Sequence, residues 1–140
     1  MTQPSNNSID LYVSAVLGKK AIGLVVLDVR DLSSVADAYI ICSGRSNRQV
    51  SAIADHIQAD LKKHKKTPLC VEGLKEGHWV LMDYGHVIIH VFYEPIRQFY
   101  DLEGLWADAE RIKTESLIKY EAKIEEESGD STEMMDDDFE

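Results

Sequence analysis

Residues 76–95, EGHWVLMDYGHVIIHVFYEP, decide the fold class of this chain. Two apolar runs flank the short polar sequence Asp83-Tyr84-Gly85-His86. Gly85 can adopt the positive φ that a tight turn requires. The pattern therefore predicts a β-hairpin, and the rest of the fold is built around it.

Side chains alternate across a strand, so the hairpin should have two chemically different faces. We take Tyr84-Gly85 as the two-residue loop; a loop of another length would shift the faces by one residue. One face is then aliphatic, apart from a thioether, and is expected to be core: Val80, Met82, Val87, Ile89 and Val91. The other face mixes large apolar side chains with polar ones: Trp79, Leu81, Asp83, His86, Ile88 and His90.

This second face has two interpretations. If helices cover only the aliphatic face, Trp79 lies in an exposed apolar patch that needs a partner. An aromatic anchor among polar neighbours is typical of protein interfaces. If the later helices cover this face as well, Trp79 is an ordinary core residue. The sequence leaves both interpretations open.

Hydrophobic periodicity predicts the other elements. Ser46 and Gln49 have the spacing of a capping box at a helix start. Helices are expected over 8–17, from about 46 to the basic KKHKK at 62–66, and in one or two short segments of 95–112; strands are expected over 24–29, 38–43 and 68–72, besides the hairpin. This order predicts an α/β fold, a mixed five-stranded sheet with helices mainly on one face.

The chain is long enough for one domain with a real core, since 44% of its 140 residues are hydrophobic. We expect a flexible N-terminus over 1–7 and the folded domain over 8–110. Charge pairs four residues apart indicate a helical extension over 111–127. The acidic composition of 128–140 predicts a disordered tail.

The net charge of −10 is unevenly distributed. Residues 121–140 hold ten acids and one base, so the first 120 residues hold fifteen acids and fourteen bases. An acidic end argues against direct binding to bare nucleic acid, where Lys and Arg must displace counterions. There is no membrane-length apolar run and no signal-peptide pattern, so we expect a cytoplasmic protein. Cys42 and Cys70 each lie in an apolar segment and are expected to be reduced and buried there.

Cys42 and Arg48 fit the C-x5-R spacing of cysteine phosphatases, between a predicted strand and helix. That chemistry also needs an acid for the leaving group, usually beside a mobile Pro, and the three prolines follow Gln3, Thr67 and Glu94. A phosphatase is therefore an alternative function only. Otherwise Cys42 is a buried strand residue, the usual place of a free cysteine.

Metal and nucleotide sites are not indicated. His86 and His90 have H-x3-H spacing, but four residues of a strand span roughly 13 Å, too far for shared ligation. Closely spaced carboxylates for two metal ions are absent from the hairpin, and there is no Walker or GxGxxG spacing. We expect no cofactor and no enzyme activity.

Four segments together resemble the ribosomal silencing factor family, also called Iojap-like proteins: AIGLVVLDV, ADAYIICSGRSNRQVSAIADHI, EGHWVLMDYGHVIIHVF and RQFYDLEGLWADA. The resemblance covers about residues 8–109. It implies a nucleotidyltransferase-like fold without the catalytic carboxylates. It also implies binding to the large ribosomal subunit through ribosomal protein fourteen (L14), which sterically blocks joining of the small subunit and represses translation.

The resemblance leaves two matters open: some members form homodimers, and a role in large-subunit assembly or maturation is the alternative function. It places the binding residues on the hairpin, and adds three weaker candidates after it: Trp79, Leu81, Asp83, Tyr84, His86, Ile88 and His90, then Arg97, Tyr100 and Trp106. His86 stands where the family commonly has an acid. That substitution removes a charge contact or makes it pH-dependent.

Overall fold

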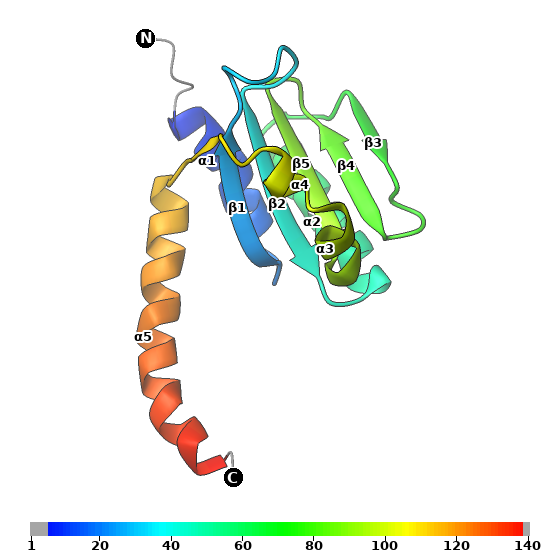
Figure 1. Cartoon of the computed structure of the whole chain (residues 1–140). Coiled ribbons are helices and arrows are strands. Elements are labelled where there is room, and N and C mark those ends of the chain that lie inside the picture. Colours follow the sequence, from blue (N-terminus) through cyan, green and yellow to red (C-terminus); the bar gives the residue numbers. More distant parts are fainter. Residues whose placement is uncertain (1–5, 139–140) are drawn as a thin grey trace.

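A computed structural model describes residues 6–138, with side-chain surroundings for 8–127 (Figure 1). The elements occur in this order: α1 Asn6–Leu17, β1 Ile22–Asp28, β2 Ala38–Gly44, α2 Asn47–Lys63, β3 Cys70–Glu72, β4 Trp79–Asp83, β5 Val87–Tyr93, α3 Glu94–Tyr100, α4 Leu102–Leu105, β6 Glu110–Arg111 and α5 Glu115–Asp138. The predicted order of helices and strands is confirmed.

The described strands form one sheet in the order β3-β4-β5-β2-β1-β6. β2 and β5 pair in parallel, and every other neighbouring pair is antiparallel. All five predicted strands are present and the mixed α/β class is confirmed. The sixth strand, β6, pairs with β1 through only two residues, which is too short to leave a periodic signal in the sequence.

The hairpin turn lies one residue later than predicted. The Tyr84 N–H donates to the Val87 carbonyl at 2.9 Å, so the loop is Gly85-His86 rather than Tyr84-Gly85. Gly85 has φ 94°, the left-handed conformation that the turn requires. The pairing therefore moves by two residues, with Trp79 opposite Phe92, and each strand residue keeps its predicted face.

α1 and α2 cover one face of the sheet (Figure 1). α2 begins as predicted, because the Ser46 side chain accepts a hydrogen bond from the Gln49 N–H at 3.0 Å. The Gln49 side chain in turn accepts from the Arg45 N–H, one residue before the usual capping-box partner. The aliphatic face of the hairpin is completely buried beneath these helices, as predicted: Val80, Met82, Val87, Ile89 and Val91.

α3 and α4 lie over part of the opposite face (Figure 1). Pro95 stands in the first turn of α3, where the missing N–H costs nothing. Asp101 ends α3 in a left-handed conformation, with φ 48°, and its side chain accepts from the Gly104 N–H at 3.2 Å. These two short helices pack against β1, β2 and β5 and leave β4 less covered.

α5 packs on α1 only near its start and then projects away from the body (Figure 1). Leu117 is buried, and Asp10 of α1 accepts hydrogen bonds from the Ser116 N–H and Oγ at 2.9 and 2.8 Å. The helix starts at Glu115, four residues later than the predicted extension. The segments predicted as flexible, 1–7 and 128–140, lie outside the residues with described side chains, and those expectations stay predictions.

Among the described residues, no helix combines the length and the apolar character needed to span a membrane.

Candidate protein-binding surface around Trp79

Trp79 is the first residue of β4 and lies on the face opposite α1 and α2. Its ring stacks on Phe92 at a centroid distance of 4.8 Å and contacts Tyr100 of α3 at 5.1 Å. The side chain remains half-buried and lines a shallow hollow of about 240 Å³ together with Glu72, Gly73 and Leu81. Trp79 therefore combines a fixed ring with an accessible edge.

His90 fixes the indole from the neighbouring strand. The Trp79 Nε1–H donates to His90 Nδ1 at 3.0 Å, which places the imidazole proton on Nε2. His90 is 4% exposed, and burial lowers its pKa from 6.5 to about 4. The ring is therefore neutral at physiological pH and can keep accepting from the indole.

Exposed apolar side chains continue from Trp79 onto α3. Phe99 is 78% exposed and Tyr100 is 55% exposed, and their rings meet edge to face at 5.1 Å. Together with the half-buried Leu81, these residues form what we call the Trp79 surface: Trp79, Leu81, Phe99 and Tyr100. Contiguous exposed aromatic side chains of this kind mark interaction sites.

The predicted hairpin residues separate into three groups. Trp79, Leu81 and Asp83 share the open face and are half-buried. Ile88 and His90 lie on the same face but are buried, so they support the surface from below. Asp83 Oδ1 accepts from the Gly85 N–H at 2.8 Å, so this carboxylate also stabilises the turn.

Tyr84 and His86 lie on the α1 side instead. The Tyr84 ring is 5.3 Å from Tyr12 of α1, and the His86 ring is 5.5 Å from the same tyrosine. His86 Nε2 is also within 3.3 Å of the Ser8 hydroxyl. The predicted placement of His86 beside Trp79 is therefore wrong, because the turn begins one residue later and directs both side chains toward α1.

Two of the three weaker candidates brace the fold, Arg97 from a buried position and Trp106 from a half-buried one. Arg97 is 9% exposed and donates to the Ser43 hydroxyl, the Gly23 carbonyl and both carboxylate oxygens of Glu103, at 2.7 to 3.0 Å. Trp106 packs edge to face on Tyr39 at 5.2 Å. Trp106 is half-buried, as Trp79 is, but among these three candidates it is Tyr100 that contacts Trp79 and joins the Trp79 surface.

Phe99 was not predicted. It stands beside Tyr100 in the segment RQFYDLEGLW. α3 ends at Tyr100, after only seven residues, and both rings are accessible. No pattern in the sequence marks Phe99, because its exposure depends on where α3 ends.

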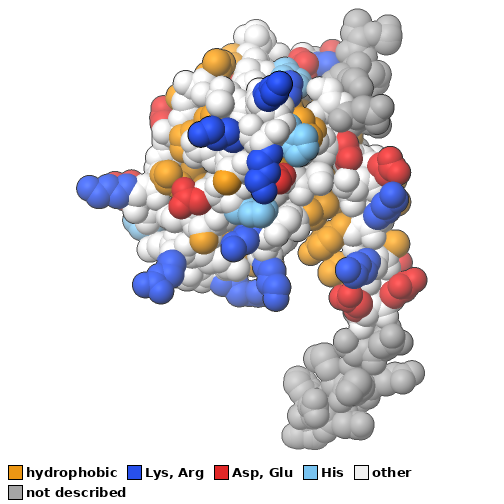
Figure 2. Space-filling model, turned by 180° about the vertical axis from the view of Figure 1, so that it is seen from behind, with side chains coloured by type: hydrophobic (Ala, Val, Ile, Leu, Met, Phe, Trp, Pro, Cys, Tyr) orange, Lys and Arg blue, Asp and Glu red, His pale blue; other side chains and the backbone are white. Residues whose placement is uncertain are grey.

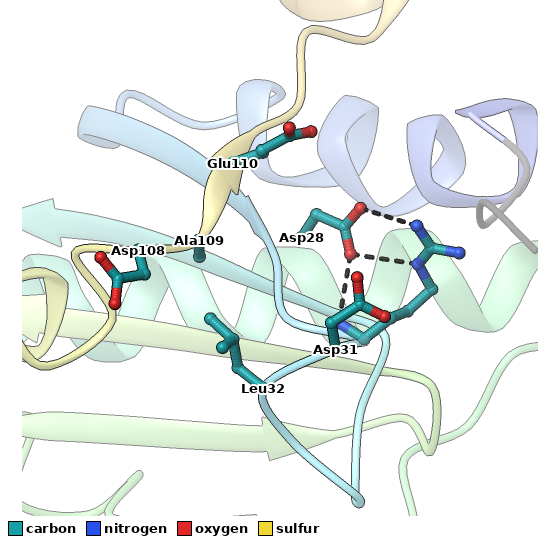
Figure 3. A pocket seen from close by; sticks show the side chains of 7 residues that line it. Asp28, Asp31, Leu32, Asp108, Ala109 and Glu110 are labelled. Atoms are coloured by element: carbon teal, nitrogen blue, oxygen red, sulfur yellow. Dashed lines mark hydrogen bonds and ion pairs between the residues drawn. The ribbon is translucent and has the colours of Figure 1, made fainter.

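A second hollow, of about 260 Å³, lies where the end of β1 meets β6 (Figure 3). Several carboxylates line it: Asp28, Asp31, Asp108 and Glu110. Arg30 forms an ion pair with Asp28 at 3.1 Å, and its hydrogen bonds help to lower the Asp28 pKa against the raising effect of desolvation. Within the described part of the chain, no cluster of His, Cys, Asp and Glu has a metal-binding arrangement.

The geometry argues against Cys42 as a nucleophile. Its side chain is completely buried in β2, and burial raises the pKa of the thiol to about 12. The reactive thiolate is therefore scarce at neutral pH and closed off from solvent. Arg48 is exposed at the start of α2 and is not among the groups that perturb this thiol. The expected burial is wrong for Cys70, which is exposed because β3 is a short strand at the edge of the sheet.

The fold and the Trp79 surface define a small α/β domain with an exposed aromatic patch and, among the described residues, no metal-binding cluster. The chain belongs to the ribosomal silencing factor family. The family model for "Ribosomal silencing factor during starvation" matches residues 2–138. This confirms the resemblance seen in the sequence, and the family name links the chain to ribosome association and translation regulation.

Related proteins extend this result. A ribosomal silencing factor of Halalkalibacterium halodurans is 38% identical over 110 residues, 79% of this chain and 94% of that protein. The one from Bacillus subtilis is 42% identical over 91 residues, which is 65% of this chain and 77% of that protein. A mouse protein named mitochondrial assembly of ribosomal large subunit protein 1 is 30% identical over 102 residues, 70% of this chain but 44% of that protein.

A solved structure agrees with the fold. The crystal structure of a Chromobacterium violaceum protein matches with a TM-score of 0.71 and 35% identity, covering 74% of this chain and 87% of the other.

Proposed function

We propose that this protein binds the large ribosomal subunit through ribosomal protein fourteen and sterically prevents joining of the small subunit. The observation that carries the proposal is the half-buried Trp79, held by Phe92, Tyr100 and His90 within a surface that Phe99 and Tyr100 leave apolar and open. Family membership supplies the ribosome as the target.

The arrangement of Trp79 suits an interface anchor. Buried aromatic anchors often dominate binding energy, and an anchor that is already immobilised loses little conformational entropy on binding. The His90 hydrogen bond and two ring contacts immobilise the indole before any partner arrives. Asp83, half-buried at the other end of β4, would face a Lys or Arg of the ribosomal protein and set the register.

The proposed mechanism requires no bond chemistry. With the Trp79 surface on the large subunit, the sheet, α1 and α2 would occupy space that the small subunit needs. The sealed Cys42 thiol is consistent with a non-catalytic role. The expected cytoplasmic location follows from the same proposal, because the protein acts where subunits join.

Sedimentation of purified subunits tests this function. The wild-type protein should reduce the fraction of joined ribosomes, whereas Leu81→Glu should not, because it places a charge in the apolar surface. Ile118→Glu is the matched control, since Ile118 is 53% exposed on α5. Unchanged subunit joining with excess wild-type protein would refute the proposal.

A role in large-subunit assembly is the second candidate, favoured by the name of the mouse relative. It would use the same surface on a different particle. Comparing affinities for mature large subunits and for purified precursors separates the two functions. Preference for precursors, with no effect on joining of mature subunits, would select assembly.

A homodimer, which some members of the family form, would compete for the Trp79 surface if it formed there. Light scattering on the wild type and on Leu81→Glu tests this expectation: a dimer through this surface should become monomeric in the variant.

A further inference from the structure

Five basic side chains lie at one end of the sheet, contributed by three separate segments. Lys19 and Lys20 precede β1, Arg45 and Arg48 lie between β2 and the first turn of α2, and Lys75 lies between β3 and β4. We call this group the basic end. The sheet register brings the segments together, because Ile22, Ser43, Phe92 and Trp79 form one row across four adjacent strands.

Hydrogen bonds hold these segments against each other. Gln49 Nε2 donates to the Lys20 carbonyl at 3.4 Å, while the Gln49 Oε1 accepts from the Arg45 N–H. Ser51 of α2 donates to the Leu74 carbonyl at 2.8 Å, which holds the β3–β4 loop beside α2. A hollow of about 330 Å³ opens between Gly18, Lys19, Lys20 and Gln49, with room for a phosphate group.

The charges of the basic end are available for a partner. All five side chains belong to exposed residues, and among the described residues no carboxylate lies within 4.0 Å of their charged nitrogens. The acids nearest Lys75 in the sequence are Glu72 and Glu76, and both are exposed. Figure 2 shows Lys and Arg side chains spread over the helix side and along its lower border, with few acidic side chains among them.

We infer that the basic end binds the phosphate backbone of ribosomal RNA beside the protein docking site. This inference rests on the proposed function, which brings the protein to a surface rich in phosphate. The basic end is continuous with the Trp79 surface, since Trp79 shares the row of Ile22 and Ser43 and Gly73 lines the Trp79 hollow. A protein seated by Trp79 would therefore present these cations at the edge of its contact.

This structure modifies the expectation of little nucleic-acid contact, which depended on the net charge of the whole chain. The ten acids of residues 121–140 belong to α5 and the segment after it, whereas the basic end lies on the sheet domain. α5 projects away from this domain (Figure 1). Net charge therefore underestimates the local attraction of the basic end for phosphate.

The test compares two triple variants with the same change in charge. The basic-end variant lacks three charges at the basic end and combines Lys19→Gln, Lys20→Gln and Lys75→Gln. The control variant lacks three exposed charges at the other end of α2 and combines Lys62→Gln, Lys63→Gln and Lys66→Gln. Affinity of each full-length protein is measured for large subunits across a salt series, and for isolated ribosomal protein fourteen.

We expect the basic-end variant to bind large subunits about tenfold more weakly near physiological salt, with a salt slope lower by about 2 to 3. Its affinity for the isolated ribosomal protein should equal that of the wild type, and the control variant should match the wild type in both assays. Equal behaviour of the two triple variants would overturn the inference alone. An equal loss toward the isolated protein would also overturn it, because the basic end would then contact protein. Wild-type protein that fails to bind the subunit would overturn the proposed function as well.

Discussion

The two faces of the sheet are built from different kinds of side chain. Under α1 and α2 the hairpin contributes aliphatic groups and one thioether, all with no exposed area. On the opposite face it contributes an indole, an imidazole and a phenyl ring, and part of this face stays open beside the short α3. The comparison indicates that the helix-covered face supplies most of the stability, and in our proposal the other face supplies a rigid surface for a partner.

The largest expected effect is the loss of a side chain from the helix-covered face. Ile89→Ala should lower the free energy of unfolding by about 4 kcal/mol, because it leaves a cavity in a fully packed core. Leu81→Ala, on the other face of the same hairpin, should cost less, about 2 kcal/mol, since Leu81 is only half-buried and its loss leaves no closed cavity. Urea unfolding measures both. Equal losses would contradict the division between the two faces.

The Trp79 side adds a buried polar brace, Arg97, to its smaller apolar cluster. Arg97→Ala should destabilise the protein by about 3 kcal/mol, because it leaves Glu103 and Ser43 without their buried partner. Lys113→Ala removes an ion pair in which both side chains are about half-exposed, and should cost less than about 1 kcal/mol. The same denaturation assay compares them, and a loss from Arg97→Ala no larger than the control would refute the brace.

Acid should lower the free energy of unfolding of the protein through the titration of His90. Its pKa falls from 6.5 in the unfolded chain to about 4 in the folded one. Between these values the unfolded chain binds the proton and the folded chain does not, so stability present above pH 6.5 is lost as pH falls toward 4. The loss should reach about 3 kcal/mol.

His90→Phe provides the control for this titration, since it removes the ionisable group from the same position. Its unfolding free energy should change much less between pH 6.5 and 4, whatever its absolute value. Identical pH slopes for wild type and variant would show that His90 is not the group responsible.

The smallest effect concerns the helix that covers the aliphatic face. Ser46→Ala should cost about 1 kcal/mol, because the Gln49 N–H loses its capping acceptor. Ser34→Ala, at an exposed position in the β1–β2 loop, is the control and should be near neutral. Thermal unfolding measures both. A neutral Ser46→Ala would mean that water replaces the cap at no cost.

The sequence predicted the fold well because its signals are local. The periodicity of α2, its Ser46 cap and the alternation along β4 and β5 each depend on neighbouring residues. The two faces of the hairpin were also predicted, since a register shift of two residues keeps every strand side chain on its face. Trp79 and Leu81 were therefore placed together from the sequence alone.

The remaining features depend on distant contacts. The one-residue error in the turn moved His86 to α1, and only the packing against Tyr12 reveals this. Phe99 depends on where α3 ends, and Arg97 depends on Ser43 and Gly23 of distant strands. Neither pattern nor spacing contains such information.

Binding of Trp79→Ala to large ribosomal subunits tests the role of this surface most directly. Tyr120→Ala is the matched control, an aromatic residue 37% exposed on α5, and circular dichroism verifies that both variants are folded. We expect Trp79→Ala to lose about 2 kcal/mol of binding free energy, roughly thirtyfold in Kd, with Tyr120→Ala unchanged. A folded Trp79→Ala protein that binds as tightly as the wild type would contradict the proposed surface.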